Sequence, residues 1–264
     1  MLLVTDLDGT LLDDNKHISD ASIHAIEKWV DQGNYFTIAT GRTEDTCRLA
    51  TDLLPVNTPV ILYNGASLYD IKERRPVWDR TLDFSGFRGL LTRLQEQIPE
   101  VCVEIFCYGP IRLTNPRAIM DPYIIREKQP YMEDSLERIP DRCLKIMLSA
   151  EKELLQRAVK DMKLDQLTGC SHFYSADVYY EILPENCTKQ TAVEKLADLL
   201  KIGQDQVAAA GDHMNDIELL SWAGHSYCPA NANSETKKHA KVLKNTNNGQ
   251  MISEIITELL ENEV

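Results

Sequence analysis

Short, almost continuous hydrophobic runs mark the first part of the chain. They cover residues 2–6, 35–40 and 59–65, and each ends in polar or small residues. Between the first two, residues 18–33 carry apolar side chains at helical spacing, with Ser19 as a candidate N-cap. The order strand, helix, strand, together with uninterrupted apolar strands, predicts a parallel sheet that is covered on both faces.

The pattern changes between about residues 82 and 182. Strands such as 101–105 and 177–182 alternate polar and apolar positions, and two helical stretches, 85–97 and 151–163, separate them. This part of the chain therefore predicts a mixed sheet with helices.

The parallel-type pattern returns after Thr188. We expect a helix to about residue 201, a strand over 207–212, a helix from about 215, a short strand near 225–228 and a helical tail from about 250. The predicted fold class is α/β, with a doubly wound, mainly parallel, Rossmann-like sheet as the core and an inserted α+β cap domain. We place the core at residues 1–82 plus 185–264 and the insertion at 83–184.

Composition excludes several partners. The 264 residues carry a formal net charge of -13, which argues against a nucleic-acid backbone or an anionic membrane surface as the main partner. No apolar run approaches the ~18 residues that a membrane span needs, and the first residues lack a basic, secretory-type start. Seven cysteines without a CxxC pair fit a reducing compartment, so we expect a cytoplasmic protein. The sequence gives no indication of the oligomeric state.

Three of the apolar runs end next to residues that handle phosphate or metal ions, namely Asp6, Thr40 and Asp212. In an open α/β sheet, ligands bind outside the carboxyl ends of the strands, so these positions are expected to converge. Asp8 follows Asp6 by two residues in the segment DLDGT. Taken alone, such an acidic pair is equally compatible with a tight turn.

A second acidic segment, GDHMND, contains Asp212, Asn215 and Asp216 at a predicted strand-to-helix turn. By itself it is equally compatible with an N-cap followed by acids that favour a helix N-terminus. Together with Asp6 and Asp8 it would gather like charges that repel one another unless a cation lies among them. Lys189, at the start of a predicted helix, is one candidate cation, although an ordinary surface lysine is the alternative.

Two further turns are candidates for the edge of the site. Thr40-Gly41-Arg42 offers a hydroxyl and an unhindered backbone N–H to a phosphate, and its alternative is an ordinary turn. Arg42 itself is a possible phosphate ligand or a surface salt-bridge partner. Asn64, in the segment NGA, either borders the site or forms a tight turn.

The motifs DLDGT, TGR, a downstream lysine and GDHMND, in this order, resemble the haloacid dehalogenase (HAD) superfamily, specifically its Cof-type phosphatases with a large cap. The match spans the predicted core. The sequence departs from the family pattern at Gln190, where a glycine commonly follows the lysine.

The resemblance implies a phosphoric monoester hydrolase that uses Mg²⁺. Asp6 would attack phosphorus to give an aspartyl-phosphate, and Asp8 would act as general acid and base. The ion would be held by the Asp6 carboxylate, the Asp8 backbone carbonyl and the Asp212 carboxylate. The phosphoryl group would bind Thr40, Gly41 and Lys189, while Asn215 and Asp216 would orient the water ligands of the metal and Lys189. The insertion would set the choice among small phosphorylated metabolites, such as sugar phosphates.

Two other functions remain open at this stage. A phosphomutase would use the same fold and discharge the aspartyl-phosphate onto a sugar hydroxyl instead of water. A non-enzymatic receiver-like signalling module also combines acids, a hydroxyl residue and a lysine on an α/β sheet. In receivers, however, the acidic pair and the phosphorylated aspartate usually lie on different strands, whereas Asp6 and Asp8 are almost adjacent here.

Overall fold

The computed structural model describes residues 1–114, 124 and 129–262. Residues 115–123 and 125–128 of the predicted insertion, and residues 263–264 of the predicted helical tail, lie outside them. The chain divides into two compact units. Unit 1 comprises Met1–Arg42, Cys47–Trp78 and Thr188–Val264, and unit 2 comprises Thr43–Thr46 and Asp79–Cys187.

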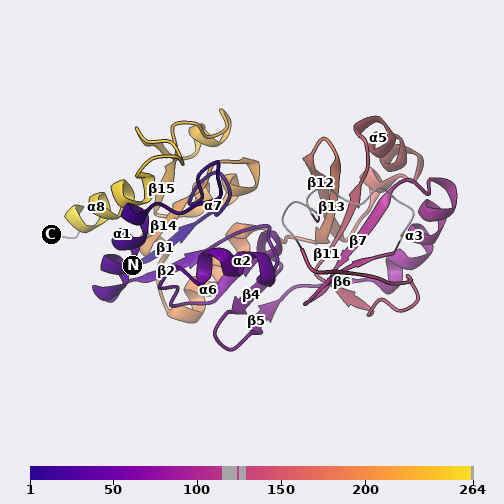
Figure 1. Ribbon diagram of the computed structural model, residues 1–264, viewed down its shortest axis with the longest axis horizontal. Helices are drawn as coiled ribbons and strands as arrows, with labels where there is room; N and C mark the ends of the chain where they lie inside the picture. The colour runs from indigo at the N-terminus through magenta and orange to yellow at the C-terminus, as the bar shows by residue number, and fades with distance from the viewer. Residues whose placement is uncertain (115–123, 125–128, 263–264) are drawn as a thin grey trace. The chain divides into compact units, whose positions relative to one another are not determined.

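Unit 1 is built on a five-stranded sheet in the order β16-β15-β14-β1-β2, and all of its pairings are parallel (Figure 1). An antiparallel hairpin of β3 and β4 follows helix α2 (Glu44–Thr51), and β5 extends that small sheet. A parallel bridge between Ala39 and Ile61 continues the pairing from the end of β2 to β3. The strands are β1 (Leu2–Thr5), β2 (Tyr35–Ile38), β3 (Val60–Leu62), β4 (Ser67–Asp70), β5 (Arg75–Asp79), β14 (Val207–Ala210), β15 (His225–Cys228) and β16 (Lys241–Val242).

Helices cover this sheet. They are α1 (Asp20–Asp31), α2 (Glu44–Thr51), α6 (Lys189–Leu200), α7 (Ile217–Trp222) and α8 (Met251–Asn262). Leu2 and Val4 of β1 share one hydrophobic cluster with apolar residues of α6 and α7. Because side chains alternate along a strand, Leu3 points to the other face of the sheet. Helices α1 and α8 pack against each other (Figure 1). The predicted doubly wound, mainly parallel core is confirmed.

The ends of α1 follow from its sequence. Ser19 is the N-cap, and its side chain accepts a hydrogen bond from the Ser22 backbone N–H. Gly33 follows the helix with φ +85°, a conformation that glycine adopts without steric cost. The predicted helix over 18–33 is thus observed with boundaries two residues inside each end.

Unit 2 contains a six-stranded sheet in the order β12-β13-β11-β7-β8-β9, in which only β8 and β9 pair in parallel among the described residues. A short pair, β6 and β10, lies apart from it. The strands are β6 (Leu82–Asp83), β7 (Cys102–Phe106), β8 (Ile111–Leu113), β9 (Tyr131–Glu133), β10 (Arg142–Cys143), β11 (Lys145–Ser149), β12 (Cys170–Ala176) and β13 (Tyr179–Pro184).

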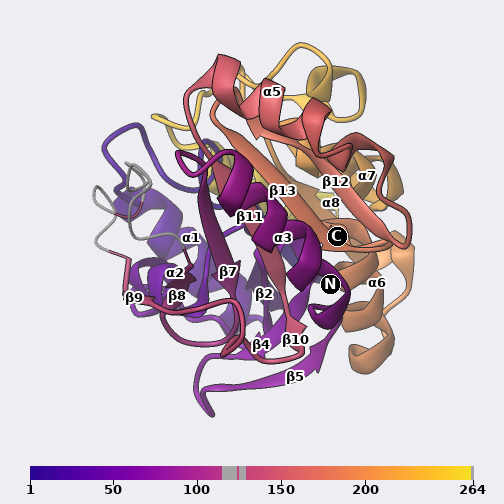
Figure 2. The same ribbon diagram turned by 90° about the vertical axis from the view of Figure 1, so that its right-hand side faces the viewer.

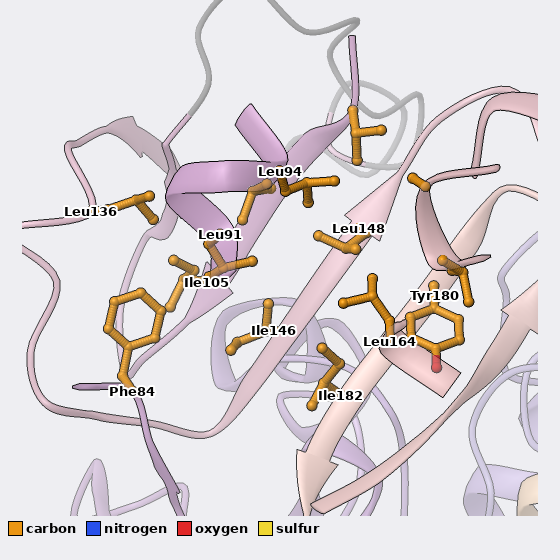
Figure 3. Close-up of a cluster of buried hydrophobic side chains, with 14 of the residues drawn as sticks. Phe84, Leu91, Leu94, Ile105, Leu136, Ile146, Leu148, Leu164, Tyr180 and Ile182 are labelled. Carbon is orange, nitrogen blue, oxygen red and sulfur yellow. The ribbon is translucent and has the colours of Figure 1, made fainter. Parts of the chain in front are cut away.

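Two helices, α3 (Ser85–Gln97) and α5 (Lys152–Asp161), lie side by side over this sheet (Figure 2). Leu91 and Leu94 of α3 point toward Ile105, Ile146 and the other apolar side chains of the sheet (Figure 3). This unit has its own hydrophobic core, which agrees with the mixed sheet and helices predicted for the middle of the chain.

Candidate active site

The carboxyl ends of β1 and β14 bring two aspartates to one edge of the parallel sheet. The two strands are neighbours, and the backbone N–H of Asp6 donates to the Ala210 carbonyl at 2.8 Å. Asp6 follows β1 directly, and Asp212 follows β14 after one glycine. Two of the three strand-end residues that were expected to converge, Asp6 and Asp212, are therefore close together in the structure.

The turn after Asp6 packs tightly on Asp212. Gly9 has φ +79°, and a Cβ atom at this position would lie 2.5 Å from Asp212 Oδ2. The Thr10 hydroxyl donates to Asp212 Oδ1 at 3.1 Å. Only glycine allows both the backbone conformation and this approach, which explains the glycine in the DLDGT segment.

Lys189 lies between two aspartates. Its Nζ is 2.6 Å from Asp6 Oδ1 and 2.7 Å from Asp216 Oδ1, and its side chain is only 1% exposed. Burial lowers the pKa of the Lys189 ammonium, but the Asp216 and Asp6 carboxylates outweigh this effect and hold the pKa above its ordinary value. Lys189 is thus a buried cation within the acidic cluster, and the alternative of an ordinary surface lysine is wrong.

The position of Lys189 is fixed by the start of α6. Thr188 is the N-cap and exchanges hydrogen bonds with Thr191, which forms a capping box. Gly65, with φ +105°, fits against this turn, because a Cβ atom there would lie 2.1 Å from the Thr188 carbonyl oxygen. The NGA segment and the lysine turn are therefore in direct contact.

Three carboxylates form a group suited to a hard cation. One oxygen from each of Asp6, Asp212 and Asp216 lies within 4.8 Å of the others. Burial raises the pKa of the Asp6 carboxyl, and the charges of Asp216 and Asp212 raise it further. The Lys189 ammonium lowers it, but the resulting pKa still lies well above the ordinary range. Burial and the charge of Asp216 likewise raise the pKa of Asp212. Carboxylate oxygens at this density are the donors that Mg²⁺ prefers, so the residues fit that ion.

Asp216 is largely occupied by protein donors. Its Oδ2 accepts hydrogen bonds from the backbone N–H groups of Asp212 at 3.0 Å and His213 at 3.1 Å, while Oδ1 accepts from Lys189. A Cβ atom at Gly211 would lie 2.5 Å from the Asp216 side chain. Asp216 therefore stabilises the turn that carries Asp212 and also binds the Lys189 ammonium. His213 takes part in this turn through its backbone N–H.

The turn after β2 is joined to the same site. Thr40 is buried, and its hydroxyl accepts a hydrogen bond from the Arg42 backbone N–H at 3.2 Å. Asn64 donates its backbone N–H to the Thr40 carbonyl, and its side-chain Oδ1 accepts from Asn215 Nδ2 at 3.1 Å. Gly41 lies against Asn64, since a Cβ atom there would be 3.0 Å from Asn64 Oδ1. Asn64 thus links two of the predicted motifs.

Asp8 is held by two cations. Arg42 donates from Nε to Asp8 Oδ2 at 2.7 Å and from a terminal nitrogen to Oδ1 at 2.8 Å, and Lys16 Nζ lies 2.6 Å from Oδ1. Burial raises the pKa of Asp8, but the hydrogen bonds and charges of Arg42 and Lys16 prevail and bring it to about 2. Of the two roles left open for Arg42, the structure shows an ion pair, and Arg42 is only 5% exposed rather than at the surface.

Two polar residues beside the site were not singled out from the sequence. Thr10 belongs to the DLDGT segment itself, and its position next to the paired aspartates was an available signal. Lys16 lies on an exposed turn in which the Asp13 side chain accepts from the backbone N–H groups of Asn15 and His17. A lysine in a polar turn carries no sequence signal that separates it from a solvated surface residue.

Comparison with known proteins identifies the family. A sequence model of the haloacid dehalogenase-like hydrolase family matches residues 3–256. The chain is 27% identical to the 5-amino-6-(5-phospho-D-ribitylamino)uracil phosphatase YwtE of Bacillus subtilis, over 99% of this chain and 98% of that protein. It is 26% identical to the phosphatase YwpJ of the same organism, over 98% and 99% of the two chains. A haloacid dehalogenase-like hydrolase from Bacteroides thetaiotaomicron has a similar structure, with a TM-score of 0.85 at 23% identity and 98% coverage of both chains.

The chain therefore belongs to the haloacid dehalogenase-like hydrolase family. Relatives that cover nearly its whole length carry phosphatase names, so the predicted enzyme class, a phosphatase, is confirmed. Within the described part of the chain, none of the helices combines the length and the apolar character of a membrane span.

Proposed function

We propose that the protein is a Mg²⁺-dependent phosphatase that hydrolyses a small phosphate monoester through an aspartyl-phosphate on Asp6. The observation that carries this proposal is the environment of Asp6. Its carboxylate lies at the end of β1, 2.6 Å from the buried Lys189 ammonium and within metal-sharing distance of Asp212. A carboxylate so placed has both a cation for an incoming phosphoryl group and partners for a metal ion.

Asp6, the Asp8 backbone carbonyl and Asp212 would hold the magnesium ion. When bound, the ion neutralises the acidic cluster and the phosphoryl charge, so that a carboxylate can approach phosphorus. Asn215 and Asp216 orient the surroundings of the ion and of Lys189. This assignment is supported by the cluster geometry and by the family resemblance.

The protein's own residues account for the two chemical steps. In the first, an Asp6 oxygen forms a bond to phosphorus as the ester P–O bond breaks, and a proton from Asp8 goes to the departing alkoxide. In the second, a water oxygen attacks phosphorus, the bond to Asp6 breaks, and Asp8 takes the water proton. Lys189, the Thr40 hydroxyl and the Gly41 N–H bind the phosphoryl oxygens.

Residues 83–184 serve in this proposal as the cap that sets substrate choice. Their compactness as a separate unit with its own core supports the division. Small phosphorylated metabolites are the expected substrates. Sugar phosphates belong in a test panel, and so does 5-amino-6-(5-phospho-D-ribitylamino)uracil, the compound in the name of YwtE. Seven free cysteines are consistent with a cytoplasmic location.

A panel of phosphate esters assayed with Mg²⁺ tests the proposal. Wild-type protein should release inorganic phosphate from at least one ester, EDTA should abolish the release, and Asp6→Asn should lose nearly all activity while its circular dichroism is unchanged. A phosphoryl group that moves to another hydroxyl, without free phosphate, would indicate a phosphomutase. Stoichiometric phosphorylation without turnover would indicate a receiver-like module.

A further inference from the structure

The carboxylate of Asp8 has an unusually complete set of cationic partners for a side chain that is 40% exposed. Arg42 contributes two N–H···O bonds, one to each carboxylate oxygen, and Lys16 adds a third contact at 2.6 Å. A guanidinium that contacts both oxygens fixes the plane of the carboxylate as well as its position. Asp8 is therefore oriented by its neighbours.

Arg42 is itself held in place. Its backbone N–H donates to the Thr40 hydroxyl at 3.2 Å, and its carbonyl accepts from the Tyr63 N–H at 3.1 Å. With its side chain 5% exposed, the guanidinium has little freedom to leave the carboxylate. The turn after β2 thus supplies a rigid partner to the turn after β1.

Lys16 reaches Asp8 from a strained turn. Its φ is +64°, a left-handed conformation that costs a non-glycine residue free energy, and its backbone N–H donates to the Asp13 carbonyl at 3.0 Å. Glycine or asparagine would occupy this position with less strain. Arg74, Lys163 and Lys201 have the same backbone conformation, so it is the contact of the Lys16 ammonium with Asp8 that points to a role for the side chain.

We propose that Arg42 and Lys16 form a clamp that positions the Asp8 carboxylate for proton transfer to and from the leaving group and water. This inference rests on the proposed function, in which Asp8 is the acid and base. Arg42 and Lys16 are positioning residues here and do not contact the reacting atoms. The proposal resolves the alternative left open for Arg42 in favour of a carboxylate partner over a phosphate ligand.

Leaving-group dependence of kcat/KM separates positioning of an acid from binding of phosphate. An alkyl phosphate needs a proton on its departing oxygen, whereas p-nitrophenyl phosphate releases a stable phenolate that needs little help. Loss of the acid in Asp8→Asn should lower kcat/KM about 100-fold or more on the alkyl ester, with a much smaller loss on p-nitrophenyl phosphate. The difference between these two losses in Asp8→Asn is the largest that the positioning variants can reach.

Lys16→Asn is the decisive variant, because asparagine tolerates the left-handed turn and carries no charge. We expect kcat/KM on the alkyl ester to fall about 10-fold, with a loss below about 2-fold on p-nitrophenyl phosphate. Lys16→Arg should restore most of the loss. The inhibition constant of inorganic phosphate should be unchanged in all Lys16 variants, since the ammonium contacts Asp8 and not the phosphoryl group.

Arg42→Lys provides the second arm. It keeps a cation of similar length and loses the two-pronged contact, so the same leaving-group contrast should appear in a protein that folds. Equal losses on both esters with weaker phosphate inhibition would show that these cations bind phosphate and would overturn the clamp, as would unchanged kinetics in Lys16→Asn. Wild-type protein without phosphatase activity would overturn the proposed function and the clamp together, so the two failures are distinguishable.

Discussion

Lys189 offers the sharpest test of the electrostatic reasoning. Lys189→Met keeps most of the side-chain volume and removes the ammonium from between Asp6 and Asp216. At 2.6 and 2.7 Å, each contact corresponds to a Coulomb attraction of about 6 kcal/mol at an effective dielectric constant of about 20. Desolvation of the ions offsets much of this attraction. Breaking a buried pair nevertheless leaves unpaired charge, and the expected net loss is about 3–5 kcal/mol.

The assay is urea unfolding in EDTA, so that no metal ion replaces the missing ammonium. The loss should shrink as the pH is lowered from 8 toward 5. Without Lys189 the carboxyl pKa values in the folded protein rise further above their unfolded value of 3.8. The folded state then binds more protons than the unfolded chain over this window, and stability falls as the pH increases. Lys195→Met, on the same helix, is the control and should change stability by less than about 0.5 kcal/mol.

A double-mutant cycle makes the argument refutable. In the wild-type background, Asp6→Asn should destabilise the protein, because Lys189 loses one of its two carboxylate partners. In the Lys189→Met background the same change should stabilise it, because one of the unpaired carboxylates is gone. Additivity of the two changes within about 0.5 kcal/mol would show that these residues do not interact energetically and would refute the reasoning.

Three further predictions follow from the same structure. With free Mg²⁺ at about ten times its dissociation constant, the wild-type protein should gain about 1.4 kcal/mol of stability in thermal melts. Asp212→Asn should abolish this gain. If the variant keeps the gain, the ion binds elsewhere. Gly65→Ala should cost at least about 2 kcal/mol, because the new Cβ would meet the carbonyl at the start of α6. Gly33→Ala has the strain without the clash and should cost about 1 kcal/mol, so equal losses would contradict the contact. Glu181→Gln should lower the free energy of unfolding in urea by about 3 kcal/mol, because the buried Lys145 ammonium loses the carboxylate 3.2 Å away. Adding Lys145→Met should recover most of this loss, and no recovery would show that the ion pair is not its cause.

The fold was largely readable from hydrophobic patterning because its long elements carry strong periodicity. The helix predicted over residues 85–97 coincides with α3, and the strand predicted near 225–228 coincides with β15. Strands β4 and β5 of the small β3-β4-β5 sheet were not predicted. β5 contains Arg75 and Pro76 and is partly exposed, so it shows neither a buried run nor a clear alternation. Two-residue strands such as β16 are too short to show any period.

Within the candidate site, the sequence singled out the residues at strand ends and in the motifs that follow them, but not Thr10 and Lys16, and it did not show which partners each carboxylate has. The carboxyl ends of parallel strands meet by topology, which is why Asp6, Asp212 and Thr40 were expected together. The close carboxylate group consists of Asp6, Asp212 and Asp216, whereas the carboxylate of Asp8 is taken up by Arg42 and Lys16. The direction in which the Asp8 side chain points depends on the left-handed turn at Gly9 and on the contact with Arg42, which lies 34 residues away in the sequence. Neither feature can be predicted from residue spacing.

The two aspartates of the DLDGT segment have opposite electrostatic surroundings although they are two residues apart. Asp6 and Asp216 share the Lys189 ammonium, and the carboxylate of Asp212 lies beside theirs, so that group has two more negative than positive charges. Asp8 has two cations for a single carboxylate. The pKa of Asp6 is accordingly raised and that of Asp8 lowered. A divalent cation would balance the first group, which would leave Asp6 ionised, as a nucleophile requires. The excess positive charge around Asp8 favours its anionic form, which accepts a proton from water in the second step, and opposes the protonated form that gives a proton to the leaving group in the first step. The charges around these two residues therefore suit the nucleophile and the base of the proposed reaction, whereas the acid form of Asp8 in the first step forms against the charge of Arg42 and Lys16.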